Sequence, residues 1–240
     1  AGAQSLASVL QVNRALTSVN LLKNDLGDGA AAVVAAAKQH GNIKTLCGIE
    51  EGQTELDLSY EDLNSADAVL LSFDLEFNRA LKSAKLSGNS FGDEGTTALS
   101  DALKANSTLE ILELRNNGVG AAGAQSLAAM LQVNRALKSA NLGFNDIGDE
   151  GAVAISAALE NNTTLTELNL EPKYMGVKIS ATGAQAIAKM LAVNRALKSA
   201  DFSANSIGDE GTAALSDALK TNSTLEELKL HINAIGAAGA

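Results

Sequence analysis

A pattern of leucine and asparagine residues returns along this chain at an almost fixed interval. The clearest copy covers residues 109–117, LEILELRNN, and reads L-x-x-L-x-L-x-x-N. Copies of this frame start at positions 81, 109, 137, 165, 197 and 225, so the step is 28 residues, lengthened once by 4. A chain with such a period buries its apolar residues between stacked neighbouring repeats rather than around one centre.

The first part of the chain follows the same pattern, with one interruption. Gly2-Ala3-Gln4-Ser5-Leu6-Ala7 recurs as residues 123–128 at an offset of 121, which is four steps of 28 plus 9. We place the 9 extra residues in a loop from Cys47 to Glu55 that interrupts a strand, and the 4 others between Glu171 and Ser180. We therefore expect a single solenoid over residues 1–240 with about eight repeats.

Each repeat has a second half with the spacing of an amphipathic helix. After a turn such as residues 92–95, Gly-Asp-Glu-Gly, apolar residues of the segment Thr96 to Lys104 recur three and four positions apart. Asp93, Asp149 and Asp209 precede these helices at one phase. We expect each to cap the free N–H groups of its own helix.

Stacking strand–turn–helix–turn units in parallel determines the shape. Strands lie about 4.8 Å apart and helices about 10 Å, so the stack curves with the strands on its inner, concave face. The frame closes on an asparagine, which we expect to satisfy backbone groups of the turn; these residues are Asn24, Asn89, Asn117, Asn145, Asn205 and Asn233. Glu61 and Lys173 replace it in the two repeats next to the insertions.

The chain resembles the ribonuclease-inhibitor-type leucine-rich repeats. Their 28-residue units carry L-x-x-L-x-L-x-x-N followed by I-G-x-x-G-A, and residues 145–152, NDIGDEGA, and 205–211, NSIGDEG, match this text. The resemblance covers essentially all of the chain and implies an α/β right-handed horseshoe with parallel strands on the concave face and helices on the convex face. Ribonuclease inhibitor itself is rich in cysteine and tryptophan, which this chain is not, so inhibition of ribonucleases does not carry over.

The resemblance leaves three functions open. Members of the family include scaffolds of the cytoskeleton and cilia, a GTPase-activating protein, and the sensor domains of multidomain immune receptors of the NLR type. We favour a non-enzymatic protein-interaction scaffold. A GTPase-activating protein of the leucine-rich-repeat type and an NLR-like sensor domain are the alternatives.

Charge and composition restrict the kind of partner that the chain can bind. A net charge of −10 disfavours nucleic acid and anionic membranes and favours a protein partner with a basic surface. No apolar run approaches the roughly 20 residues that cross a bilayer. With only Cys47 the chain forms no internal disulfide, which favours a reducing compartment, and we expect a cytoplasmic protein, including a cytoskeletal or ciliary one. Since both ends fall at the same phase of the repeat, we expect the chain to be a window of a longer array.

Few residues are candidates for catalysis or metal binding. Two histidines, His40 and His231, form no set with serine and aspartate, and His40 with Cys47 gives too few soft ligands for zinc. The Gly-Asp-Glu-Gly turns lack a phosphate-loop lysine and are better explained as helix starts. The sequons at Asn106, Asn162 and Asn222 recur at one phase and indicate a structural turn. We expect no cofactor, metal or catalytic residue.

The concave face is the strongest candidate for a binding site. Residues that alternate with the buried leucines of each strand point away from the core. They are mostly acidic in one kind of repeat and small and hydroxylated in the other, with apolar residues near the strand ends. Our predicted partner-binding residues are Glu55, Asp57, Tyr60, Lys85, Ile111, Glu113, Arg115, Asn141, Phe144, Glu167, Asn169, Glu171, Asp201, Lys229 and His231. The alternative is that these residues are simply solvated.

Overall fold

The computed structural model describes residues 2–237 and 239, in which eight helices alternate with seven strands. The helices are α1 (Gly2–Val12), α2 (Gly29–His40), α3 (Ser65–Phe77), α4 (Gly92–Ala105), α5 (Ala121–Val133), α6 (Gly148–Leu159), α7 (Ala181–Val193) and α8 (Gly208–Leu219). The strands are β1 (Glu55–Asp57), β2 (Ser83–Lys85), β3 (Ile111–Glu113), β4 (Ser139–Asn141), β5 (Glu167–Asn169), β6 (Ser199–Asp201) and β7 (Glu227–Lys229).

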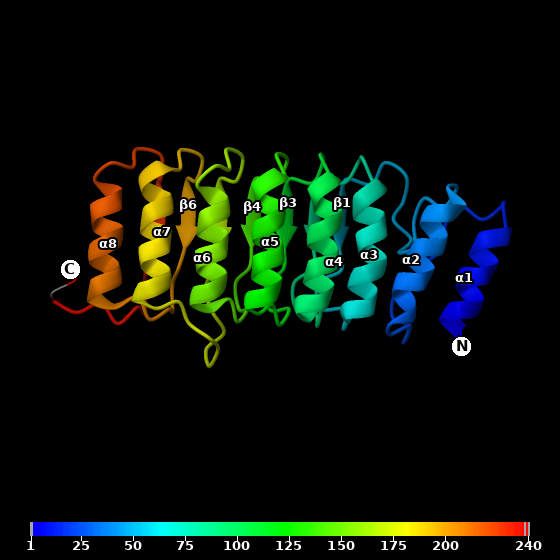
Figure 1. Cartoon of the computed structure of the whole chain (residues 1–240), viewed down its shortest axis with the longest axis horizontal. Coiled ribbons are helices and arrows are strands. Elements are labelled where there is room, and N and C mark those ends of the chain that lie inside the picture. The colour runs from blue at the N-terminus through cyan, green and yellow to red at the C-terminus, as the bar shows by residue number, and fades with distance from the viewer. Residues whose placement is uncertain (1, 238, 240) are drawn as a thin grey trace.

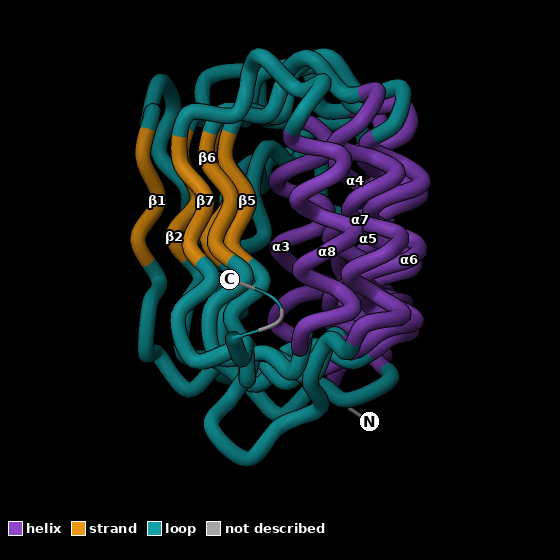
Figure 2. The backbone as a smooth tube through the Cα atoms, turned by 90° about the vertical axis from the view of Figure 1, so that its left-hand side faces the viewer, coloured by secondary structure: helices purple, strands orange, loops and turns teal. Residues whose placement is uncertain are grey.

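The strands form one parallel sheet in the order β1 to β7, and the helices form a second layer on one side of it (Figure 2). Figure 1 shows the helices side by side along an elongated molecule. Neighbouring strands pair at the 28-residue step, as in Leu112 with Ala140, and the step becomes 32 between Leu168 and Ala200. The predicted α/β solenoid is confirmed.

The core lies between the sheet and the helices. Leu109, Leu112 and Leu114 of one repeat are each 0% exposed, and Leu127 of α5 is 2% exposed. The central residue of each three-residue strand points into this layer, while its two neighbours face the other side of the sheet. The apolar layer is continuous from repeat to repeat, so each repeat depends on its neighbours for burial.

The asparagine that closes each frame joins two repeats. The amide nitrogen Nδ2 of Asn145 donates to the carbonyls of Leu114 and Leu142, both at 2.9 Å. Its Oδ1 accepts the N–H groups of Asn117 and Val119 at 2.9 and 3.0 Å. The predicted role in satisfying the turn is therefore confirmed, and much of that turn belongs to the preceding repeat.

A second series of asparagines follows the helices and includes the sequons. Asn106 is 3% exposed; its Nδ2 donates to Leu75 of the preceding repeat at 2.6 Å, and its Oδ1 accepts the N–H groups of Thr108 and Leu109 at 2.9 and 2.8 Å. Because the amide is buried and fully hydrogen-bonded, the prediction of a structural turn is confirmed.

The helix starts differ from the prediction. Residues 92–95 are not a turn before the helix: α4 begins at Gly92, and α6 and α8 begin at Gly148 and Gly208. These three glycines have φ values of 59°, 60° and 63°, which a residue with a Cβ adopts only at a cost. The aspartate after each glycine therefore lies inside the first helical turn.

The expected capping within each helix was wrong. Asp93 Oδ1 accepts the N–H groups of Gly120 and Gly123, at 2.7 and 2.9 Å, at the start of the next helix, α5. The N–H of Gly92 is meanwhile bound by the carbonyl of Asn117, also from the next repeat. Asp93 and Asp149 thus cap the helix of the repeat that follows their own.

The sheet is interrupted before β1. Ser18 bridges Thr45 and Asn20 bridges Cys47, but neither of these short segments pairs with β1. The chain instead runs from Gly48 to Thr54 as a loop before Glu55. α1 and α2 accordingly lie apart from the regular row, at the blue end of Figure 1, with α1 tilted.

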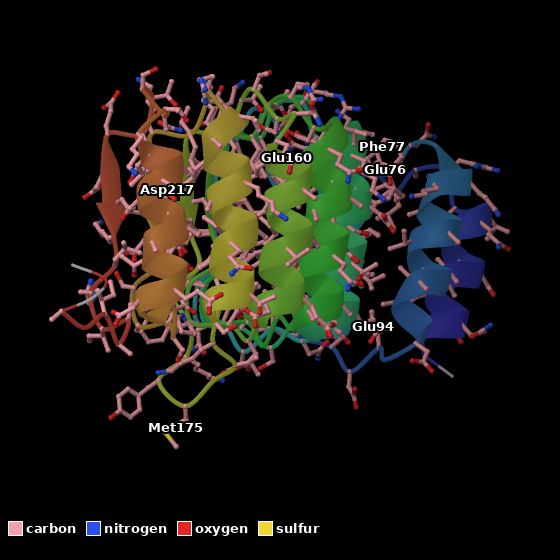
Figure 3. All side chains as sticks on the ribbon, turned by 60° about the vertical axis from the view of Figure 1, so that its left-hand side comes forward. Glu76, Phe77, Glu94, Glu160, Met175 and Asp217 are labelled. Carbon is pink, nitrogen blue, oxygen red and sulfur yellow. The ribbon has the colours of Figure 1, made fainter. Side chains whose placement is uncertain are left out.

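The extra residues after β5 form a projecting loop. In most repeats the residue before the closing asparagine has a positive φ, such as 58° at Phe144 and 60° at Ala204. The equivalent position is Pro172, whose ring holds φ near −65°. The usual turn cannot form, and the chain makes a longer excursion around Met175 at the lower edge of Figure 3.

Candidate functional site

The outward side of the sheet, which we call the concave face, carries the predicted partner-binding residues on successive strands. Glu55, Asp57, Ile111, Glu167 and Lys229 are exposed there. The half-buried positions on β2, β3, β4, β5 and β6 are Lys85, Glu113, Asn141, Asn169 and Asp201. Tyr60, Arg115, Phe144, Glu171 and His231 lie at or just beyond the strand ends. The parallel register brings these side chains, far apart in sequence, onto one surface.

Acidic side chains outnumber basic ones among the named residues of this surface, and several of them form no ion pair in the described part of the chain. Glu55, Glu113 and Glu167 form no ion pair within the described residues. At the far end, Glu227 Oε1 lies 3.4 Å from Lys229 Nζ. A hydrogen bond from Ser199, followed by one from Lys229, lowers the pKa of Glu227. Hydrogen bonds from Ser59 lower the pKa of Asp57. The lowered pKa keeps Asp57 and Glu227 charged at neutral pH.

Large side chains lie at the ends of the strands. Tyr60 is 66% exposed and its ring lies against Gly88, where a Cβ would approach Tyr60 Cδ1 to 2.2 Å. The guanidinium carbon of Arg115 lies 3.6 Å from the centre of the Phe144 ring. Such a stack holds both side chains in one orientation, so little conformational entropy remains to be lost when a partner binds.

The two histidines contact different neighbouring segments. His231 is exposed, and its Nδ1 lies 2.7 Å from the Oγ of buried Ser203. His40 is buried; its Nδ1 accepts the N–H of Asn42 and its Nε2 contacts the carbonyl of Asn13. Each ring is occupied in joining neighbouring segments. Within residues 2–237 and 239, no three His, Cys, Asp or Glu side chains gather as a metal site.

Sequence reasoning missed the residue that closes the sheet at its interruption. Asp74 of α3 is 1% exposed, and its carboxylate accepts the N–H groups of Leu46 and Cys47 at 2.7 and 3.2 Å and the hydroxyl of Thr45. Burial raises the pKa of Asp74 to about 6, against the lowering effect of these hydrogen bonds. A signal was present, because the same phase of later repeats holds alanine or methionine, as at Ala102 and Met130.

Cys47 is buried beside this carboxylate. Burial raises the pKa of its thiol well above the usual value, and the nearby charge of Asp74 adds to the effect. The thiol is therefore protonated and shielded at neutral pH. The predicted free cysteine is present, but it lies inside the junction rather than on an open loop.

Comparison with known proteins agrees with this architecture. A family model described as a leucine-rich repeat matches residues 105–128 and 133–156. These two segments match leucine-rich repeats, and the other repeats of the chain have the same strand–helix architecture. No curated protein sequence matches it. The matched segments contain β3 and β4 and most of α5 and α6.

Two solved structures are similar to this one at low sequence identity. The tropomodulin C-terminal domain from Caenorhabditis elegans is 15% identical, with a TM-score of 0.51, over 65% of this chain and 92% of that one. A structure titled leiomodin-1 actin-binding site 2 is 23% identical, with a TM-score of 0.46, over 70% and 79% of the two chains. None of the helices in residues 2–237 and 239 has the length and apolar character to span a bilayer.

Proposed function

We propose that this leucine-rich-repeat protein is a non-enzymatic interaction scaffold of the ribonuclease-inhibitor type. It binds a protein partner with a basic surface through its acidic concave face and its rim loops. One observation carries the proposal: Glu55, Glu113 and Glu167 stand on one face of a continuous sheet without an ion-pair partner among the described residues. Unpaired carboxylates on a rigid surface favour a partner that supplies the opposite charge.

Rigidity supports this function. The strands are tied by parallel pairing and by two series of asparagines, so the face is organised before a partner arrives. Tyr60, Ile111 and the Arg115–Phe144 stack supply larger contact surfaces among the charges. Aromatic and arginine side chains are the types that most often contribute strongly to protein interfaces.

The loop after β5 adds an apolar contact at the rim. Tyr174 and Met175 are 88% and 89% exposed at its tip. The loop is tied back to the solenoid because the N–H of Val177 donates to Asp146 Oδ1 at 3.0 Å. A partner that crosses the concave face toward this rim meets both charge and apolar surface.

Charge reversal tests the proposal. One variant combines Glu113→Lys, Glu167→Lys and Glu171→Lys. A matched control combines Glu94→Lys, Glu150→Lys and Glu160→Lys, at exposed positions of the helix layer. Figure 3 labels Glu94 and Glu160. Proteins captured from cells by the parent are quantified for both variants. We expect basic proteins to be lost from the concave-face variant and retained by the control. Equal capture by both variants would remove this face from consideration.

A further inference from the structure

The interruption of the sheet leaves one internal strand with an open edge. In a parallel ladder, alternate residues of a strand direct their N–H and C=O groups to opposite neighbours. Leu58 N–H donates to Lys85, and Thr54 C=O accepts from Lys82 and Ser83, so the even-numbered residues of this strand face β2. Glu55 and Asp57 therefore direct their backbone groups to the other side, where no strand pairs.

On the other side of the interruption, side-chain oxygens bind the backbone N–H groups that a neighbouring strand would otherwise use. Leu46 and Cys47 donate their N–H groups to Asp74, and Ile49 donates to Thr45 Oγ1 at 3.0 Å. These N–H groups are therefore not available to pair with β1. On the β1 edge, Gln53 Nε2 covers only the carbonyl of Glu55, at 2.7 Å, and the N–H groups of Glu55 and Asp57 have no acceptor within the described part of the chain.

A cavity lies at the rim where the strands begin, in the region of the interruption, and none of its lining residues belongs to β1. This cavity of about 840 Å³ is lined by the starts of both short segments, by the loop after Cys47 and by residues 77–80. Ile43 and Ile49 are among its apolar lining residues. Such a volume is in the range of sites that hold a small ligand or a short peptide segment.

We propose that the open edge of β1 binds an extended peptide segment of a partner, which pairs with the backbone of Glu55 and Asp57 as an added strand. Main-chain hydrogen bonds hold such a segment, and alternate side chains give it specificity. Its outward residues lie beside the exposed carboxylates of Glu55 and Asp57, and are therefore lysine or arginine. The residue between them points, like the buried Leu56 of β1, toward the core layer and is apolar. The ligand is thus a basic–apolar–basic segment.

This inference rests on the proposed function, since it assigns part of the concave face to a partner segment. Different variants test the inference and the proposed function, so one can be contradicted without the other. The variant with Lys at 113, 167 and 171 leaves β1 unchanged, whereas changes at Asp57 leave the centre of the face unchanged.

Substitution of Asp57 separates its charge from its N–H group. Asp57→Ala removes the carboxylate and keeps the N–H, while Asp57→Pro removes both. Proline is compatible with this site because the N–H it lacks faces away from β2. Glu227→Lys, at the other end of the sheet, is the control against Glu55→Lys for the same change of charge. Circular dichroism and thermal melting establish that each variant is folded.

The probe is the peptide acetyl-Thr-Lys-Val-Lys-Thr-amide, and the control peptide carries glutamate in place of lysine. We expect calorimetry to show binding of the basic peptide only, weakened by Asp57→Ala and by about a further tenfold by Asp57→Pro. Glu55→Lys should weaken binding and Glu227→Lys should not. Hydrogen exchange at the amides of Glu55 and Asp57 should slow when the peptide is bound.

Several results would overturn the proposal. They are absence of binding up to about 1 mM peptide, equal binding of the glutamate peptide, or equal affinity of the folded alanine and proline variants. Analytical sedimentation tests whether a second copy of this chain, and not a partner peptide, pairs with the edge. If the protein forms dimers that Asp57→Pro abolishes, a second copy of this chain occupies the edge and the partner peptide does not.

Discussion

Asp149 caps the helix that begins beyond Ser180, in the repeat that follows its own. Its Oδ1 accepts the N–H of Ser180 at 2.7 Å and that of Gly183 at 3.0 Å, and its Oδ2 accepts the Ser180 hydroxyl at 2.6 Å. Asp93 bonds α5 in the same way, and Asp209 Oδ1 accepts the N–H of Gly236 at 2.6 Å. At every second junction between neighbouring repeats, a carboxylate therefore joins the two repeats in addition to the sheet and the core.

Asp149→Ala should destabilise the protein by about 1–3 kcal/mol, because it leaves N–H groups at the start of α7 without an acceptor. Urea unfolding measures the change. The neighbouring substitution Glu150→Ala removes the same charge from an exposed side chain of the same helical turn and should change stability by less than about 0.5 kcal/mol. Equal effects of the two substitutions would show that charge near the helix end, and not the cap, is responsible.

Leu114→Ala should cost about 2–5 kcal/mol, since this side chain is 0% exposed and its loss opens a cavity between sheet and helices. Because stability is shared between neighbours, hydrogen exchange should also increase in the adjoining β2 and β4. Ile111→Ala is the control, on the same strand but 39% exposed on the other face. A Leu114→Ala protein that unfolds at the parent's urea concentration would contradict this burial.

The buried carboxyl of Asp74 should make the junction sensitive to pH. Burial raises its folded-state pKa to about 6 from the ordinary value of 3.8, so the folded protein binds its proton more tightly than the unfolded chain does. Its contribution to stability is greatest below pH 3.8 and is lost as pH rises to about 6. The loss should be on the order of 3 kcal/mol.

Asp74→Asn isolates this contribution. The free energy of unfolding of the parent minus that of the variant should fall between pH 4 and about 6 and stay constant above this range. Exposed carboxylates whose pKa is lowered, such as Glu110, act in the opposite direction but are common to both proteins. A difference that does not change with pH would contradict the raised pKa.

Cys47 should react slowly with a thiol reagent in the folded protein, because it is buried and burial raises the pKa of its thiol. Reaction with Ellman's reagent should accelerate at least about a hundredfold when urea unfolds the chain. Ser107→Cys in a Cys47→Ser background places a thiol at an exposed turn and should react quickly in the folded state. Similar rates at the two positions would mean that the junction opens readily.

Local pattern was sufficient to predict much of this structure. The 28-residue period placed the strand frames, Leu112 and Leu114 in the core, and the closing asparagines in the turns, because each follows from alternation and repetition along the chain. The list of outward residues could be predicted for the same reason. Helix starts were misplaced, since a glycine with positive φ followed by Asp-Glu has the composition of a turn as well as of a first helical turn.

The sequence by itself determined the period, the two layers and the face that each strand residue occupies. Only the tertiary structure decided which donors Asp93 and Asp149 bind, how Asp74 ends the pairing of Leu46 and Cys47, and that β1 keeps an open edge. These contacts join groups about one repeat apart in sequence, and the local pattern does not show which donors of the other repeat each acceptor meets. Relative placement of neighbouring repeats selects among them, and that placement is a property of the stack.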